Sequence, residues 1–185
     1  MKKEIIEWIK ALGLAVVLGL VITTFIGGTK VTGNSMSPTL QDGDFLITYN
    51  FIRKINRGDI VVMNTDLEIN ERDVAGLNFI ARWRVGKYKK LIKRVIAVEG
   101  DSVVVKDGKV ILNGVLLDEK YINGNNTPGN ISIDKVPEGK VFVMGDNRIN
   151  SLDSRSKEIG LVDKKDIVGK AVFRVYPFAH IGIVK

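Results

Sequence analysis

The 185-residue chain contains no cysteine and only one histidine, His180. The absence of cysteine excludes a disulfide framework, a Cys-rich zinc site and a cysteine nucleophile. A Ser-His-Asp triad would depend on that one histidine, which lies close to the end of the sequence, so we do not expect a triad. The lack of thiols does not fix the compartment, but it suits an oxidising exterior.

Acidic residues are in the minority, because 21 Asp and Glu stand against 28 Lys and Arg and leave a net charge of +7. Such an excess favours anionic partners, either nucleic acid or an anionic membrane surface, unless it is simply a soluble basic surface. No motif supports a nucleic-acid binder. We therefore expect the positive charge to lie beside anionic lipid rather than nucleic acid.

Charge is missing altogether from residues 11–28, ALGLAVVLGLVITTFIGG. As a helix, this run would rise about 27 Å, close to the roughly 30 Å thickness of the bilayer hydrocarbon. A buried core helix would need an apolar partner on every side. A cleavable signal peptide normally has a shorter apolar core and an A-x-A-like exit, whereas the exit here reads FIGGTKVTG. We therefore predict an uncleaved anchor within residues 1–30.

The lysines around this run predict its orientation. Lys2, Lys3 and Lys10 precede the run, and only Lys30 lies between it and Arg53. The positive-inside rule then predicts a single-pass protein of the cell membrane, with a cytoplasmic N-terminus and residues 31–185 outside.

After residue 30 the apolar residues come in short β-branched runs, which are typical of strands. The predicted strands are 45–49, 59–63, 91–98, 102–105, 109–112, 115–117, 141–144 and 166–176. Asp107-Gly108 and Asn113-Gly114 tolerate the positive φ of type I′ turns, so residues 102–117 are predicted to form a three-stranded meander. The fold class is therefore mainly β, an antiparallel sheet or barrel, with a small cap around 101–140. A helix is predicted at 66–80 and a long loop at 121–135.

Three segments carry the polar residues that could do chemistry, and each has an ordinary structural interpretation when taken alone. A serine in GNSMSPTL (33–40) is commonly a turn residue or helix cap. Lys93 and Arg94, in LIKRVIAVEGD (91–101), could be charges that protect an edge strand; strand alternation puts them on opposite faces, so one points inward. MGDNRINSLDSR (144–155) could be a solvated loop.

Taken together and in this order behind an anchor, the patterns GxSMxPTL, KRVIAVEGD and GDNRxNSxDSR resemble the bacterial type I signal peptidases. RGDIVV at 57–62 resembles a further box of that family, and the resemblance extends to FRVYPFAHIG near the C-terminus. It implies an antiparallel β fold around a Ser-Lys dyad, with no metal and no cofactor. It also implies a membrane-bound serine endopeptidase that removes signal peptides from exported preproteins after small residues, through an acyl-enzyme. We expect a monomer.

Carried onto this chain, the resemblance makes Ser35 the nucleophile and Lys93 the general base. It implies supporting roles for Ser151, Asp153, Arg155 and Asp146, with Arg155 paired to a nearby acid and Asp146 structural. Many members have a serine two residues before the nucleophile, where this chain has Gly33. The oxyanion hole would then rely on the Ser35 N–H and a second donor, either the Gly33 N–H or water. The positions that match the family's substrate pockets are Val31, Met36, Leu40, Ile92 and Leu152; on sequence grounds alone, ordinary core packing is the better explanation of each.

The dyad is chemically reasonable on this strand. A serine hydroxyl needs a neighbouring base, and lysine serves as one only when it is neutral. Burial among Ile92, Val95 and Ile96 would lower the pKa of Lys93. Ser151 could aim the ammonium through a hydrogen bond, whereas Asp146 and Asp153 are expected to stay away, since a close carboxylate would raise that pKa.

Three rival interpretations share part of this pattern. Cytosolic self-cleaving repressor-type proteases also use a Ser-Lys pair, but they lack an anchor and carry an Ala-Gly linker that is not found here. A membrane-tethered binding protein on an inactive peptidase scaffold is compatible with Gly33, although Ser35 and Lys93 argue against it. Relatives of the eukaryotic type have histidine in place of the lysine. The stretch 63–90 is not assigned.

Overall fold

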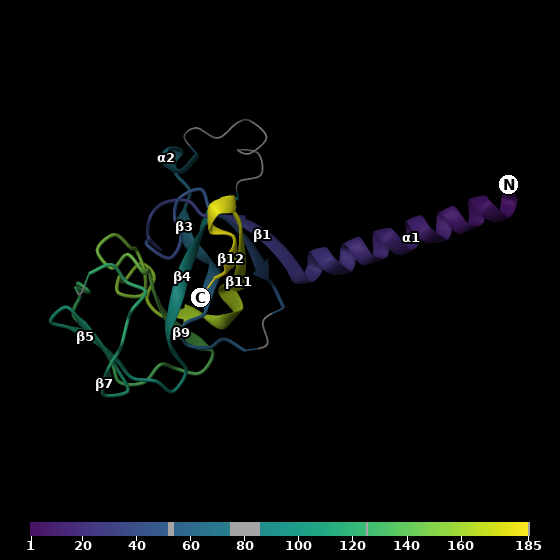
Figure 1. The fold of residues 1–185 in the computed structure, drawn as a ribbon. Helices are drawn as coiled ribbons and strands as arrows, with labels where there is room; N and C mark the ends of the chain where they lie inside the picture. Colours follow the sequence, from purple (N-terminus) through teal and green to yellow (C-terminus); the bar gives the residue numbers. More distant parts are fainter. Residues whose placement is uncertain (52–53, 75–85, 125, 185) are drawn as a thin grey trace.

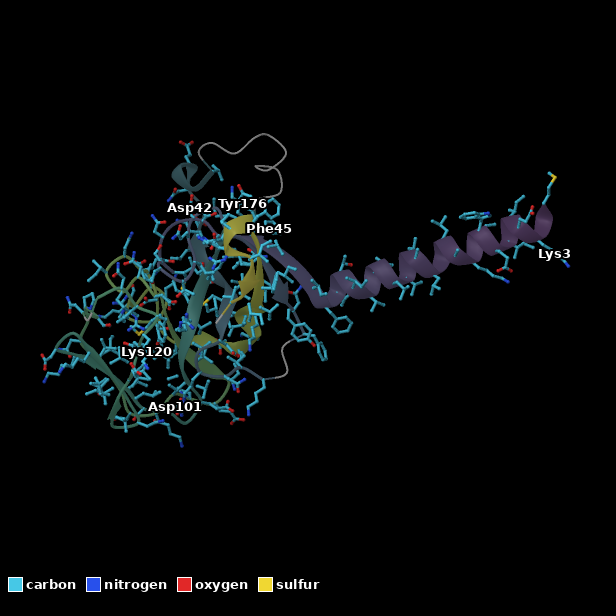
Figure 2. All side chains as sticks on the ribbon, in the orientation of Figure 1. Lys3, Asp42, Phe45, Asp101, Lys120 and Tyr176 are labelled. Atoms are coloured by element: carbon cyan, nitrogen blue, oxygen red, sulfur yellow. The ribbon has the colours of Figure 1, made fainter. Side chains whose placement is uncertain are left out.

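One long helix and two antiparallel sheets make up the computed structural model, which describes residues 1–51, 54–74, 86–124 and 126–184 (Figure 1). Helix α1 (Lys2–Phe25) projects away from the β domain. Its side chains extend into open space along its length, as Figure 2 shows. The most apolar 18-residue window within Lys3–Phe25 has a mean hydropathy of 2.2, and none of that window is buried. By length and composition, α1 is able to cross a membrane.

Helix α1 ends before the uncharged run does. The hydroxyl groups of Thr23 and Thr24 donate to carbonyls one turn back, so the last turn of the helix keeps its polar side chains satisfied. Gly27 and Gly28, which the sequence placed in the span, belong instead to strand β1 (Ile26–Lys30). Glycine is a poor helix former, and the β1 backbone gains hydrogen bonds by pairing with β2. The helix is therefore shorter than the uncharged run.

The large sheet has the strand order β1-β2-β11-β3-β4-β9-β10, and β12 also pairs with β11. All of its pairs are antiparallel. Its other strands are β2 (Phe45–Tyr49), β3 (Ile60–Glu68), β4 (Tyr88–Val98), β9 (Lys140–Met144), β10 (Val162–Asp163), β11 (Ile167–Tyr176) and β12 (Gly182–Ile183). Strand β4 lies between β3 and β9, so it is an interior strand and not a charged edge.

The small sheet forms the cap, with the order β7-β6-β5-β8. Its strands are β5 (Val103–Lys106), β6 (Lys109–Leu112), β7 (Val115–Leu116) and β8 (Ile131–Ile133). The meander prediction is confirmed, because β5, β6 and β7 are joined by turns in which Asp107, Gly108, Asn113 and Gly114 all have positive φ. Figure 2 places Asp101 and Lys120 at the end of the domain away from α1, with Phe45 and Tyr176 nearer to it.

Two predictions on irregular segments were wrong in part. Residues 121–135 are not wholly a loop, since β8 lies inside them and pairs with β5. Within the predicted helix 66–80, residues 66–68 belong to β3 and only α2 (Glu71–Val74) is helical. The rest of that stretch, 75–80, lies outside the described residues. Two 3₁₀ turns complete the described chain, η1 (Lys164–Asp166) and η2 (Phe178–His180).

Buried apolar residues join the two sheets into one body. Ile96 and Ala97 of β4, with Phe142 and Met144 of β9, pack against Val103, Val105 and Val110 of the cap. A second buried cluster is formed by apolar side chains of β3, β4 and β9 together with Val162 and Ile167. A third cluster holds the segment after β1, because Val31, Met36 and Leu40 are buried against Leu46, Ile60 and Ala171. This third cluster fixes the loop that carries Ser35.

Candidate active site

Ser35 and Lys93 meet although 58 residues separate them in the sequence. Lys93 stands in the middle of β4 with only 2% of its surface exposed. Its Nζ lies 2.8 Å from Ser35 Oγ and 3.0 Å from the Ile92 carbonyl oxygen. A neutral lysine at this place can take the proton of the serine hydroxyl, which is the geometry that an activated serine needs.

Burial makes a neutral Lys93 accessible near physiological pH. It lowers the pKa of Lys93 from 10.5 to about 8, because the charged ammonium loses its hydration. Asp153 and Asp146 oppose this shift and Arg155 supports it. The two carboxylates are therefore near enough to act on Lys93, contrary to the expectation that they stay away, but each is neutralised by its own arginine.

The serine loop is held by backbone contacts on both sides. Val31 and Asp44 are joined through the Val31 N–H and the Asp44 carbonyl, 2.8 Å apart. On the other side, the Asn147 N–H donates to the Ser35 carbonyl at 3.0 Å, and the Asn147 side chain donates to the Asn34 carbonyl. Among the described residues the Ser35 N–H has no acceptor. It is thus free to donate to the oxyanion that forms on a substrate carbonyl when Ser35 Oγ attacks it.

Gly33 has a structural reason to be glycine, and it does not provide a second donor. Its φ of +82° lies in the left-handed region, where a side chain would be strained. Its N–H already donates to Asp42 Oδ1 at 2.7 Å. Of the two donors considered from the sequence, the structure therefore does not supply the Gly33 N–H, which leaves water.

Ser151 lies beside the dyad but does not aim the ammonium as predicted. A Cβ on Gly145 would overlap both Ser151 Oγ and the Ser35 carbonyl, so these two groups pack against the same glycine. No hydrogen bond joins Ser151 to Lys93 in the described structure, and Ser151 Oγ is buried without a well-oriented partner. The hydroxyl is nevertheless near enough to Asp153 to help lower the pKa of that carboxyl.

Asp153 and Arg155 form the ion pair that the sequence suggested. Arg155 Nε and Nη2 donate to the two oxygens of Asp153 at 2.8 and 2.9 Å. Burial alone would raise the pKa of Asp153, but Arg155 and the Gly145 N–H outweigh burial and lower it. Arg155 also donates to the carbonyls of Pro128 and Arg148, so the pair ties the 145–155 segment to the cap.

Arg94 is buried as deeply as Lys93, which the sequence did not predict. Only 3% of its surface is exposed. Its Nε and Nη2 donate to Asp146 at 2.8 and 2.6 Å, and its guanidinium lies 4.1 Å from the centre of the Tyr121 ring. Asp146 therefore pairs with Arg94, which fits the structural role expected for Asp146. Through Tyr121, the cap contacts β4, the strand that carries Lys93.

A third buried ion pair, between Arg148 and Glu119, lies beyond Tyr121. Arg148 donates to Glu119 at 2.5 and 2.6 Å and to the Gly145 carbonyl at 3.0 Å, and the Tyr121 hydroxyl donates to Glu119. Burial raises the pKa of this tyrosine beyond its ordinary range. This network could not be predicted, because Glu119 and Tyr121 lie in the segment 118–127, which shows no strand pattern.

A narrow cleft of about 130 Å³ opens onto the dyad. Its lining includes Ser35 and Lys93 together with three of the predicted pocket residues, Val31, Met36 and Ile92. The other two do not line it: Leu40 is a fully buried core residue, and Leu152 is 38% exposed.

A larger cavity, of about 700 Å³, lies elsewhere, in the cap between β6, β7 and residues 117–127. It holds no serine and no pair of nucleophile and base, so we place the chemistry in the small cleft. Within the described ranges, no three His, Asp or Glu side chains are grouped to hold a metal ion.

Comparison with known proteins identifies the family of this chain. Residues 5–176 match the family described as signal peptidase, peptidase S26. The match covers most of the chain, including α1, the serine loop, β4 and the 145–155 segment. The chain therefore belongs to the signal peptidase family of enzymes.

The relatives narrow this class to type I enzymes. A signal peptidase I of Bacillus licheniformis is 38% identical over 97% of this chain and 93% of its own length. Signal peptidase I S of Bacillus subtilis strain 168 is 39% identical over 96% of this chain and 92% of its own length. A crystal structure of a signal peptidase I from Enterococcus faecalis V583 is 27% identical, covers 64% of this chain and 97% of its own, and superposes with a TM-score of 0.46.

Proposed function

We propose that this enzyme is a membrane-anchored serine endopeptidase that removes N-terminal signal peptides from exported preproteins, with Ser35 as nucleophile and Lys93 as general base. The observation that carries the proposal is the 2.8 Å contact between Lys93 Nζ and Ser35 Oγ on a strand that buries the lysine. Burial lowers the pKa of Lys93 to about 8, so a usable fraction is neutral at neutral pH.

The reaction follows from this pair as two acyl transfers. Neutral Lys93 takes the Ser35 hydroxyl proton while Oγ attacks the scissile carbonyl, and the Ser35 N–H donates to the resulting oxyanion. The Lys93 ammonium then gives its proton to the leaving amine, which departs as the N-terminus of the mature protein. Water next attacks the acyl-enzyme as Lys93 takes one of its protons. The proton returns to Ser35 Oγ, and the signal peptide leaves as a carboxylic acid.

Membrane anchoring by α1 would hold this site near its substrate. Ser35 follows the last helical residue, Phe25, by ten residues, which span at most about 35 Å when fully extended. A signal peptide has its apolar core in the bilayer and its cleavage site just beyond it. In the proposed orientation, with the N-terminus cytoplasmic and the β domain outside, enzyme and scissile bond share one depth. Exposed aromatic residues near the end of α1, among them Tyr49 and Phe51, suit contact with lipid.

The remaining parts of the proposal concern partners and boundaries. We place the anchor at residues 1–25 rather than 1–30, because β1 is part of the large sheet. Both dyad groups come from one chain, so a monomer is sufficient for activity. The positive charge of the chain favours anionic lipid as its surroundings.

A cleavage assay on a model preprotein in detergent tests the proposal. We expect wild type to cut the preprotein once, and Ser35→Ala and Lys93→Arg to be inactive. Arginine keeps the charge but cannot deprotonate at working pH. Lys106→Arg, on an exposed cap strand, is the matched control and should keep wild-type activity. A folded Lys93→Arg protein with more than a few per cent of wild-type activity would rule out Lys93 as the base.

A further inference from the structure

A second chamber of about 170 Å³ adjoins the cleft at the dyad on its helix side. The two chambers share Thr29, Val62 and Lys90 as lining residues. The second chamber is lined by Gly27 and Gly28 of β1, which follow α1 directly, whereas the first contains Ser35. A peptide that reaches Ser35 from the helix end of β1 therefore passes the second chamber first.

The strand directions agree with this path. Four antiparallel steps lead from β1 through β2, β11 and β3 to β4, so β1 and β4 run in the same direction. Along β1 the lining runs from Gly27 towards Ser35, and along β4 it runs from Lys90 to Lys93. Both walls of the groove thus lead from the membrane side to the dyad.

Lys90 lines both chambers, and no carboxylate of the groove pairs with it. Neither chamber has an Asp or Glu among its lining residues. Lys90 is exposed and makes no ion pair with any described residue, unlike Lys170 on β11, which pairs with Asp59. The groove therefore presents a cation that has no internal partner to an incoming peptide.

We propose that Lys90 is a specificity-determining residue, which favours an acidic side chain in the signal peptide a few residues before the scissile bond. This inference rests on the proposed function. Lys90 lies three residues before Lys93, or about 10 Å along an extended strand, so it faces substrate residues roughly three to five positions upstream of the cut. Because Lys90 is solvent-exposed, the preference is modest, about two- to five-fold in kcat/KM, and it is weakened by salt.

The test uses peptides that are identical except at the fourth or fifth position before the bond, which is Glu, Gln or Lys. Cleavage is measured in neutral detergent at low and high salt. Wild type should cut the Glu peptide fastest and the Lys peptide slowest. High salt should reduce the difference between these rates. Lys90→Glu should reverse the order, and Lys90→Gln should flatten it. Lys106→Glu changes the net charge equally but lies in the cap, so it should keep the wild-type order.

Each other outcome has a definite meaning. An equal rate for all three peptides with wild type, or an unchanged order with Lys90→Glu, overturns the inference while leaving the proposed function intact. Failure of wild type to cut even the Gln peptide overturns the proposed function, and the inference falls with it. Lys90 could instead bind a lipid headgroup. In that case Lys90→Glu would slow all peptides alike in anionic vesicles and have no ranking effect in detergent, which also overturns the inference.

Discussion

Replacing Lys93 by methionine should change how the stability of the protein depends on pH. In the folded protein burial lowers the pKa of Lys93 to about 8, whereas the unfolded chain returns it to 10.5. At about 1.4 kcal/mol per pH unit, keeping the buried ammonium charged costs about 3 kcal/mol at pH 7. Between pH 8 and 10.5 the unfolded chain binds a proton that the folded protein does not. The wild-type free energy of unfolding therefore gains this amount as the pH rises through that window.

Methionine has nearly the same length and does not titrate, so it removes this gain. The assay is guanidinium unfolding of the detergent-solubilised full chain, followed by circular dichroism at pH 7 and at pH 10.5. Relative to Lys93→Met, wild type should be about 3 kcal/mol more stable at pH 10.5 than at pH 7. Packing differences that do not depend on pH cancel in this comparison, as does the titration of every other group.

A stability difference that stays constant to within about 0.5 kcal/mol across this range would refute the reasoning. It would mean that Lys93 keeps its ordinary pKa when folded, and the dyad would then lack a base near neutral pH. Lys106→Met, at an exposed position on the cap strand β5, is the control for the lysine-to-methionine substitution itself.

Three further outcomes are expected. On the acid side, kcat/KM should fall with a midpoint near pH 8, and this dependence should persist in His180→Ala. A dependence that disappears in His180→Ala would contradict a lysine base. Arg94→Lys should lower the free energy of unfolding by about 2 kcal/mol or more, measured by guanidinium unfolding, because lysine cannot make the two-pronged contact with Asp146. Protease added outside spheroplasts should digest the chain beyond α1, and protection of that part would reverse the proposed topology.

Most of the strands could be predicted from the sequence, because β-branched runs and two Asx-Gly turns mark them clearly. The burial of Arg94 could not. The alternation rule assumes one buried face per strand, but β4 has the large-sheet core on one side and the cap on the other. Both Lys93 and Arg94 are therefore buried, and each needs its own partner. The alternation rule correctly predicted that the two side chains lie on opposite faces of β4. It was wrong in predicting that only one of these faces is buried.

The dyad was found by resemblance, and the contacts around it needed the structure. Asn147 reaches the Ser35 carbonyl from more than a hundred residues away, and no local pattern reports such a distance. Asp42 is closer in sequence, yet no local pattern links its carboxylate to the Gly33 N–H nine residues earlier. Strand β8 was missed because Asn, Gly and Pro surround its three residues, and it is pairing with β5 that makes them a strand.

No loop separates α1 from β1, and the Phe25 ring packs edge-on against Phe51 with 5.5 Å between centroids. A helix joined to the sheet in this way cannot shift along its axis independently of the β domain. If it crosses a bilayer as proposed, a thicker hydrocarbon layer must pull the β domain towards the lipid or straighten the helix, and a thinner layer must tilt the helix or deform the lipid. Each helical residue spans 1.5 Å and each strand residue about 3.3 Å, so the height of Ser35 above the membrane is set by the anchor's length. Bilayer thickness then becomes a variable of catalysis, through hydrophobic mismatch, for substrates held in the same membrane.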